Sequence, residues 1–235
     1  NGGPGVGQRL TSHPDVAGVT FVGSSRVAEL VYKNATANGK RAQCQGGAKN
    51  HVVVMPDAAL DDAIPNIVNS CFGHTSQRCF AVSNVMIHEK IYEPFMDRFL
   101  AACKALKLGG GLDPGVDMGP VVNKVALDKL YAAIERGLQE GARLLLDGRN
   151  PVVDKYPNGF FLGPTILEAE PEMFVFQEEI FGPVRCVKKI SNMDEALKVI
   201  NRSSYGHTAV IYTESGGLAR RFIREAQTGQ VGVNV

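Results

Sequence analysis

The chain has 235 residues, of which 44% are hydrophobic and 21% charged, and its formal net charge is +1. This length allows one large folded unit or two small ones with a sizeable core. The balanced charge gives no case for a nucleic-acid or membrane-surface partner, and no apolar run is long enough to span a bilayer. The 5 cysteines are widely spaced without a C-x-x-C pair. We therefore expect no disulfide framework, no metal site and a reducing, intracellular compartment.

The chain opens on the Gly-rich run "NGGPGVGQRL" without an initiator Met and closes on "GQVGVNV", inside a predicted strand. These ends predict a fragment of a longer protein. Gly3 and Gly5 fit the G-x-G of a dinucleotide loop, but Gln8 stands at the third glycine position. We interpret the opening run as a flexible turn before a helix.

Short apolar runs then alternate with amphipathic helical patterns. The predicted strands are 19–23, 51–55, 84–88, 142–146, 184–190, 207–212 and 231–235. Helices are predicted over 28–41 and 60–72, through 91–99 as far as the glycines at 109–111, through 127–138 with Asn123 as its cap, and from Ser191 onward. Strand–helix alternation predicts an α/β fold with mainly parallel, Rossmann-like sheets, and a boundary near residues 40–50.

Cys79, in "SQRCFAVS", is the first candidate catalytic residue. It lies in a connection between a predicted helix and a predicted strand, and Arg78 beside it favours a thiolate. Taken alone, a free cysteine is more often a small buried hydrophobe. Cys44, Cys71, Cys103 and Cys186 fall inside periodic or apolar patterns and are interpreted as structural.

Two further motifs are weak alone. In "GVTFVGSS" a strand ends at Gly23-Ser24 before a helix, where free N–H groups and a hydroxyl can meet a phosphate. In "QEEIFGPV" paired acids precede an aromatic residue, and a carboxylate there can bind ribose hydroxyls. For the first motif alone, an ordinary strand–helix turn with a Ser cap is the favoured interpretation. For the second, a solvated acidic turn is the alternative.

Together, "GVTFVGSS", "GGAKNHVVVMPDA", "QRC" and "EEIFGPV", in this order, resemble the aldehyde dehydrogenase superfamily over the whole chain. "GAKNH" and the Arg before the Cys are similar to its CoA-acylating semialdehyde branch. The resemblance implies a partial aldehyde dehydrogenase fold: residues 1–44 would end the NAD-binding domain, and 45–235 would form most of the catalytic domain. It also implies oxidation of methylmalonate or malonate semialdehyde with NAD and coenzyme A, and release of CO₂.

The resemblance carries roles to individual residues. Cys79 would be the nucleophile, and Arg78 would bind the substrate carboxylate. Ser24 would meet the NAD pyrophosphate, with Phe21 and Gly23 shaping that turn, Glu179 would bind the nicotinamide ribose, and Phe181 would lie beside the nicotinamide. A homodimer or homotetramer of the full-length protein would be expected, in the mitochondrial matrix of a eukaryote or the cytoplasm of a bacterium.

Gln45 carries a separate chemical argument. Hydrolytic family members resemble "ELGGK", whose Glu activates water, and alignment on Lys49 places Gln45 at that position. A neutral amide cannot accept a proton at pH 7, so a thioester on Cys79 should await a better nucleophile such as coenzyme A. Ser76 stands where this branch usually has glycine. The run "CQGG" is likewise an unusual version of the segment around Gln45. A hydrolytic aldehyde dehydrogenase and a non-catalytic paralogue on the same fold remain as alternatives.

Overall fold

The computed structural model describes residues 3–235 and divides into two compact units, with the division between Gly47 and Ala48. Each unit is described by itself. The division lies a few residues beyond the domain boundary expected from the sequence.

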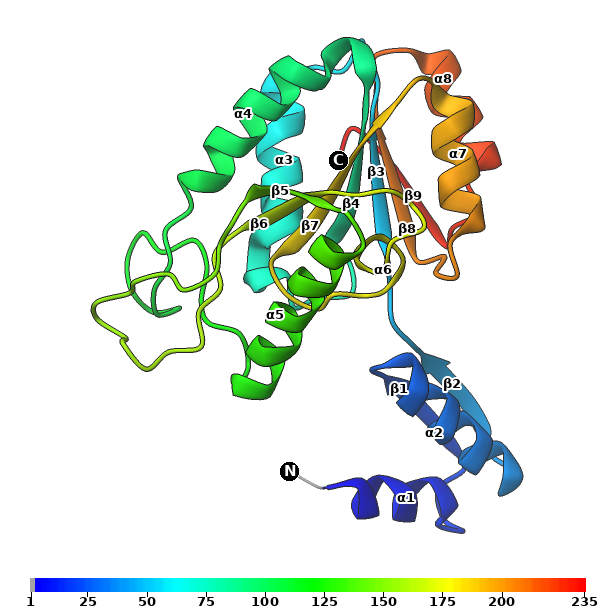
Figure 1. Ribbon diagram of the computed structural model, residues 1–235. Coiled ribbons are helices and arrows are strands. Elements are labelled where there is room, and N and C mark those ends of the chain that lie inside the picture. Colours follow the sequence, from blue (N-terminus) through cyan, green and yellow to red (C-terminus); the bar gives the residue numbers. More distant parts are fainter. Residues whose placement is uncertain (1–2) are drawn as a thin grey trace. The chain divides into compact units, whose positions relative to one another are not determined.

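The first unit is a small helix–strand–helix–strand motif (blue in Figure 1). β1 and β2 are parallel, with Phe21 opposite Cys44, and α2 packs against β2 while α1 packs against α2. The Lys40 ammonium donates to the carbonyls of His13 and Val16, which fastens the α1–β1 connection to the turn before β2. The elements are α1 (Pro4–Ser12), β1 (Gly18–Val22), α2 (Ser25–Ala37) and β2 (Arg41–Gln45).

The second unit is built on a seven-stranded sheet of order β5-β6-β7-β4-β3-β8-β9. Every neighbouring pair is parallel except β5 and β6, which are antiparallel. The mainly parallel α/β fold predicted from the sequence is therefore confirmed. The strands are β3 (Asn50–Val54), β4 (Val82–His88), β5 (Arg143–Leu146), β6 (Thr165–Glu168), β7 (Val184–Ile190), β8 (Thr208–Tyr212) and β9 (Gln230–Val233).

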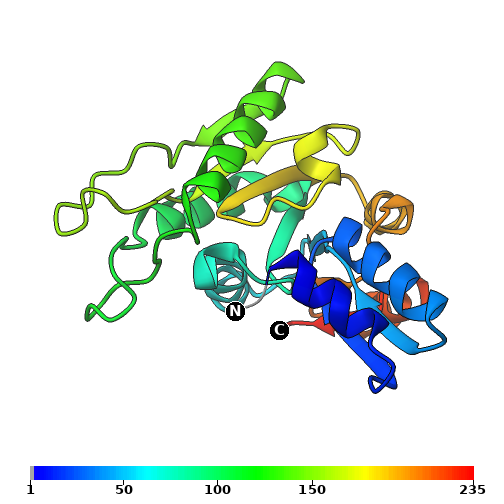
Figure 2. The ribbon, with the colours of Figure 1, turned by 90° about the horizontal axis from the view of Figure 1, so that it is seen from below.

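Helices cover both faces of this sheet (Figures 1 and 2). α3 and α4 pack on one face, and α5, α7 and α8 pack on the other. The long helices are α3 (Leu60–Phe72), α4 (Tyr92–Lys104), α5 (Lys124–Gln139), α7 (Met193–Arg202) and α8 (Gly216–Glu225). The short elements are η1 (Gly73–Ser76), η2 (Glu89–Ile91) and α6 (Phe174–Gln177).

The sheet has a hydrophobic core on each face, because successive side chains of a strand point to opposite faces. In β3, Val52 and Val54 face α3 and α4, whereas Val53 faces α5 and its neighbours. All of β3 and β4 is buried, as expected for central parallel strands covered on both sides. Each fully buried aliphatic side chain contributes roughly 1.5–3 kcal/mol relative to exposure. The sheet is therefore a firm base for the loops at its edges.

Several predicted boundaries needed correction. Most of the opening glycine run is helical and not a turn, because α1 already begins at Pro4. The fixed φ of proline suits the first helical turn. The helix through Phe95 ends at Lys104, before the glycines, and Leu108 instead forms an isolated bridge with Met118. The cap of α7 is Asn192, whose Oδ1 accepts from the Glu195 N–H at 3.0 Å.

Two strands escaped prediction. β2 ("RAQCQ") is half polar and alternates between exposed and partly buried positions, so it lacks the apolar run that marks the central strands. β6 ("TILE") is only 4 residues long. The predicted α5 cap is confirmed, because Asn123 Oδ1 accepts from the Ala126 N–H at 2.8 Å.

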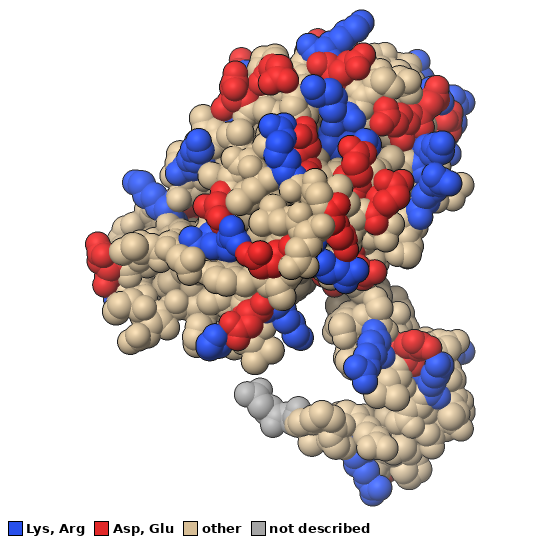
Figure 3. Space-filling model, in the orientation of Figure 1, with Lys and Arg blue, Asp and Glu red and all other residues tan. Residues whose placement is uncertain are grey.

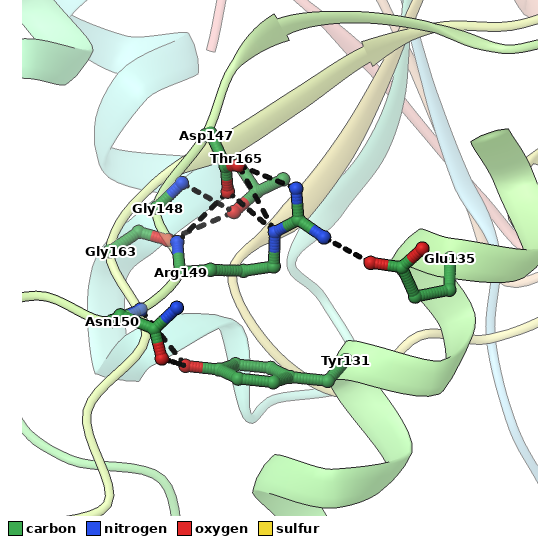
Figure 4. A network of polar contacts seen from close by, with 8 residues as sticks. All are labelled: Tyr131, Glu135, Asp147, Gly148, Arg149, Asn150, Gly163 and Thr165. Atoms are coloured by element: carbon green, nitrogen blue, oxygen red, sulfur yellow. Dashed lines mark hydrogen bonds and ion pairs between the residues drawn. The ribbon is translucent and has the colours of Figure 1, made fainter.

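A polar network holds α5 in place (Figure 4). The Arg149 guanidinium, beyond β5, pairs with Asp147 at 2.6 Å and with Glu135 of α5. The Tyr131 hydroxyl, also on α5, accepts from the Asn150 N–H at 3.0 Å. These contacts fasten α5 to the edge of the sheet, which matters because α5 forms one wall of a candidate pocket described below.

Charged side chains of both signs are intermingled on the face of residues 48–235 seen in Figure 3. Ion pairs within this unit include Arg221 with Glu225 and Lys188 with Glu170. No helix in the described part of the chain is long and apolar enough to cross a bilayer.

Candidate active site

Cys79 lies in the connection between α3 and β4, at the amino end of β4, and is partly exposed. The turn before it is left-handed, because residues 74–76 have φ angles of 55°, 54° and 57°. Such a conformation costs about 1–2 kcal/mol for each non-glycine residue. The Thr75 and Ser76 hydroxyls each donate to a backbone carbonyl, and these contacts hold the strained turn.

Asn50, the first residue of β3, holds the backbone of the candidate nucleophile. Its Nδ2 donates to the Cys79 carbonyl at 2.6 Å and to the Ala81 carbonyl at 2.9 Å. Asn50 is 1% exposed, so these contacts are shielded from water. The Cys79 N–H donates no hydrogen bond within residues 3–235. The loop is thus fixed on its carbonyl side, and one backbone donor is left beside the thiol.

The Arg78 guanidinium is directed at the carboxyl end of α3. Its Nη2 donates to the Asn69 carbonyl at 3.1 Å and to the Ser70 carbonyl at 3.3 Å. This position is favourable because the carboxyl end of a helix carries partial negative charge. Arg78 Nε is buried without a partner in the described chain, and the side chain borders a pocket of about 480 Å³ together with Phe80 and Thr208.

Glu179 and Phe181 lie in the segment between α6 and β7. The Ala48 N–H donates to Glu179 Oε1 at 3.0 Å. Partial burial raises the pKa of Glu179 above its ordinary value, and the Ala48 N–H and the Lys49 charge act in the opposite direction. The Phe181 side chain is 48% exposed. Both residues line a pocket of about 690 Å³, which α5 and Gln77 also border.

Lys49 lies between Ala48, which holds the segment of Glu179, and Asn50, which holds the loop of Cys79. Its side chain is 1% exposed, and its Nζ donates to the Val175 carbonyl of α6 at 2.7 Å. Burial lowers the pKa of Lys49 to about 8. The ammonium therefore supports α6, which leads directly into the segment of Glu179.

Arg185, on β7, is a buried cation that joins the two loops. Its Nε donates to the Cys71 carbonyl at 2.9 Å, and its Nη2 donates to the Gly182 carbonyl at 2.6 Å. Burial lowers the pKa of Arg185 to about 10, so the guanidinium remains charged at neutral pH. Cys71 lies near the end of α3, and Gly182 follows Phe181. Arg185 therefore fixes the start of the Cys79 loop relative to the Glu179 segment.

The remaining predicted residues lie in the first unit, at the carboxyl ends of its parallel strands. Ser24 caps α2 through its position, is exposed, and makes no side-chain capping hydrogen bond. A Cβ at Gly23 would lie 2.6 Å from Phe21 Cζ, so a side chain there would have to displace the Phe21 ring. The Gly23 N–H donates to the carbonyl of Gln45 at 3.1 Å. Phe21, Gly23, Ser24 and Gln45 are thus neighbours.

The structure therefore groups the predicted residues within each unit. In residues 48–235 they precede β4 and β7, which are adjacent strands, and lie at the amino edge of that sheet. The sequence argument missed the supporting roles of Asn50, Lys49 and Arg185. A signal existed for each: Lys49 and Asn50 are polar residues directly before an apolar run, and Arg185 is a charge inside the apolar strand "VRCV".

The chain is similar to known proteins along its whole length. Residues 1–235 match the aldehyde dehydrogenase family. A malonate-semialdehyde dehydrogenase of Pseudomonas aeruginosa is 42% identical over 96% of the chain. The mitochondrial, acylating methylmalonate-semialdehyde/malonate-semialdehyde dehydrogenase of Rattus norvegicus is 39% identical over 96% of the chain. A structure assigned as a Sinorhizobium meliloti methylmalonate-semialdehyde dehydrogenase, solved with NAD, superposes with a TM-score of 0.97 at 40% identity over 100% of the chain.

The chain spans about half the length of these relatives. It covers 46% of the Pseudomonas protein, 42% of the rat protein and 48% of the Sinorhizobium chain.

Proposed function

Because the chain belongs to the aldehyde dehydrogenase family, we propose that the full-length protein is an NAD-dependent, CoA-acylating semialdehyde dehydrogenase. It would oxidise methylmalonate semialdehyde to propionyl-CoA, or malonate semialdehyde to acetyl-CoA, with release of CO₂. The names of the relatives that are 42% and 39% identical to the chain support the substrate class, and the rat relative is described as acylating.

One observation carries the proposal. Ala48 and Asn50, two positions apart at the start of β3, hold Glu179 and Cys79 respectively. A thiol nucleophile and a carboxylate suited to ribose hydroxyls are thereby fastened to the same short segment. An aldehyde dehydrogenase needs this arrangement, because the aldehyde carbon on the thiol must lie close to the nicotinamide ring.

The Cys79 thiolate would attack the aldehyde carbon and form a tetrahedral thiohemiacetal. The oxyanion of that adduct needs donors, and the Cys79 N–H, which has no hydrogen-bond acceptor in the described residues, is one. Asn50 contributes by fixing the Cys79 carbonyl, which sets the orientation of the reacting thiol. Bound NAD would supply the acceptor for the hydride, leaving a thioester on Cys79.

Gln45 favours coenzyme A over water as the acyl acceptor. It is an exposed residue at the carboxyl end of β2, and its side-chain amide cannot act as a general base at neutral pH. The Cys79 thioester would then persist until a thiol attacks it. The thiol of coenzyme A is partly ionised near neutral pH and is intrinsically nucleophilic, so it suits this step.

Arg78 would bind the carboxylate of the semialdehyde. A guanidinium binds a carboxylate through paired hydrogen bonds in a fixed geometry that lysine does not reproduce. Arg78 directly precedes Cys79, and its side chain borders the 480 Å³ pocket. Its hydrogen bonds to α3 are made by Nη2 alone. This leaves part of the guanidinium for a ligand.

The residues of the first unit fit the NAD pyrophosphate. Ser24 presents a hydroxyl at the amino end of α2, a helix of 13 residues, where free N–H groups and the helix dipole favour an anion. Gly23 keeps that turn open above Phe21. We accordingly assign residues 1–44 to the end of the NAD-binding domain and 45–235 to the catalytic domain, with Glu179 on the nicotinamide ribose and Phe181 beside the ring.

The test uses the full-length protein with methylmalonate semialdehyde and NAD. With coenzyme A we expect sustained NADH formation and propionyl-CoA by mass spectrometry. Without it we expect one burst of NADH that matches the number of active sites, followed by slow turnover. A Cys79→Ala variant should lose the burst, and Cys44→Ala serves as the matched control.

Two outcomes would contradict the proposal. Equal turnover with and without coenzyme A, yielding free acid, would identify a hydrolytic aldehyde dehydrogenase. The absence of a burst with any aldehyde would identify a non-catalytic paralogue.

We further propose that the full-length protein is a homodimer or homotetramer, which light scattering would test. It would lie in the mitochondrial matrix of a eukaryote or in the cytoplasm of a bacterium, and the rat relative is named as mitochondrial. Imaging of the tagged full-length protein would test the location.

A further inference from the structure

The pocket beside Arg78 has an uneven chemistry. It has a volume of about 480 Å³ and lies between the outer face of α3 and the strands β8 and β9. Among the described residues that line it, Arg78 alone carries a charge. Phe80 and Val210 add apolar surface. A pocket with one cationic side chain, no acidic side chain, and both polar and apolar residues in its lining suits a short anion.

Thr208 lines this pocket, and its hydroxyl has no structural use in the described chain. It is the first residue of β8 and, like Val210 and Tyr212, lies on the side of the sheet that faces α3. Thr208 Oγ1 is buried and has no hydrogen-bond partner among residues 3–235. An unpaired buried hydroxyl destabilises the folded state, whereas valine has the same shape without that penalty.

Arg78 shows the same deficiency on the opposite wall. Its Nε is also buried and unpaired within residues 3–235, and its Nη2 is fastened to the end of α3. Two residues that line this pocket thus carry an unsatisfied polar atom, one in a guanidinium and one in a hydroxyl. A carboxylate has two oxygens with several lone pairs, so one group can accept from both.

We infer that Thr208 is a specificity-determining residue that binds, together with Arg78, the carboxylate of the aldehyde substrate. The inference rests on the proposed function, because it requires a carboxylate-bearing aldehyde. Thr208 reaches the ligand by rotation about χ1 between staggered rotamers, with little change in the strand. Phe80, whose ring lies 4.4 Å from that of His207 between centroids, forms the apolar wall beside the carbon chain.

The test is Thr208→Val in the full-length enzyme, with methylmalonate semialdehyde and propanal as paired substrates. Propanal lacks the carboxylate and is otherwise similar in size. We expect the KM for the semialdehyde to rise about tenfold, as for loss of one hydrogen bond to a charged group, while kcat/KM for propanal changes less than twofold. The Tm should be unchanged or higher. Thr208→Ser, which keeps the hydroxyl, should restore most of the semialdehyde affinity.

Thr165→Val is the matched control. The Thr165 hydroxyl is buried and satisfied, since it accepts from the Gly148 N–H at 3.2 Å and donates to the Gly163 carbonyl at 3.3 Å. This variant should lower the Tm and leave the ratio of the two substrates unchanged.

The outcomes separate the two proposals. A wild-type enzyme that prefers the semialdehyde, with an unchanged preference in Thr208→Val, contradicts the role of Thr208 alone. An equal loss for both substrates also contradicts it, because a structural effect would not distinguish them. A wild-type enzyme that oxidises propanal but not the semialdehyde overturns the proposed substrate class and the Thr208 role with it.

Discussion

The side-chain amide of Asn50 donates to the backbone carbonyl of Cys79 at 2.6 Å. This contact joins the first residue of a central strand to the residue that would attack the aldehyde. It orients the backbone of the nucleophile without occupying the thiol, so the thiol remains available for chemistry.

Replacing Asn50 with alanine should impair catalysis more than folding. The carbonyls of Cys79 and Ala81 would lose their shared donor, at about 1–3 kcal/mol of unfolding free energy. We expect the NADH burst rate of the full-length enzyme to fall at least tenfold, measured by stopped-flow absorbance. Asn201→Ala is the control, because Asn201 also makes two backbone hydrogen bonds but joins α7 to the end of α8. Equal effects of both variants would contradict a role at the nucleophile.

Gln45→Glu should convert part of the proposed acylating activity to hydrolysis. A carboxylate at this exposed position can accept a proton from water, which the amide cannot. We expect the slow turnover without coenzyme A to rise at least tenfold, with methylmalonate or its decarboxylation product released as free acid. Gln43→Glu, on the same strand, controls for added negative charge. No gain of hydrolysis in a folded Gln45→Glu enzyme would show that the missing base does not explain the choice of acceptor.

Arg185→Met should disturb the relation between the two loops. The variant leaves the carbonyls of Cys71 and Gly182 without their shared cation. Since Gly182 follows Phe181, we expect the KM for NAD to rise and hydride transfer to slow about tenfold, with a smaller change in the rate of Cys79 alkylation by iodoacetamide.

Arg185→Lys should be intermediate, because an ammonium keeps the charge but not the planar fork. Lys189→Met, on the same strand with a 49% exposed side chain, is the control. A folded Arg185→Met enzyme with wild-type NADH kinetics would refute the positioning role.

His51 should make the protein sensitive to acid. Burial, and then the charge of Lys49, lowers the pKa of His51 from 6.5 to about 3. Below pH 6.5 the unfolded chain binds a proton that folded His51 does not, so stability falls as the pH falls from 6.5 toward 3. By pH 4 this amounts to about 3 kcal/mol.

A His51→Gln variant tests this expectation. It should lose less stability than the wild type between pH 7 and pH 4, as measured by Tm. The two proteins should show parallel pH profiles above pH 7, where both His51 states are neutral. Parallel profiles throughout the acid range would mean that His51 is not a source of acid sensitivity.

Much of the fold could be predicted from local pattern. The helix over 60–72 was predicted at the bounds that the structure has, and the central strands were predicted within about two residues, because long apolar runs leave few alternatives. β2 could not be found this way, since its half-polar sequence has no apolar run and it is stabilised by pairing with β1. Pairing is a tertiary property that a single segment does not encode.

The candidate site divides in the same manner. Cys79 and Glu179 could be proposed from motifs, because chemistry restricts the residue types at those positions. The supports could not, because Asn50 and Arg185 act through backbone carbonyls that lie far along the chain. Arg78 was expected to face the thiol or the substrate, and its contacts with α3 depend on where the helix ends in space.

Residues 48–50 carry a consequence for how this sequence can vary. Ala48 holds Glu179, Lys49 holds α6 through Val175, and Asn50 holds Cys79. Successive residues of an extended segment point to opposite sides, so each contact depends on the position of its residue along the segment. An insertion or deletion of one residue would turn the amide of Asn50 toward α6 and the ammonium of Lys49 toward the thiol loop. The side chain of Ala48 can change, because its contact with Glu179 is made by the backbone N–H, but the length of the segment cannot.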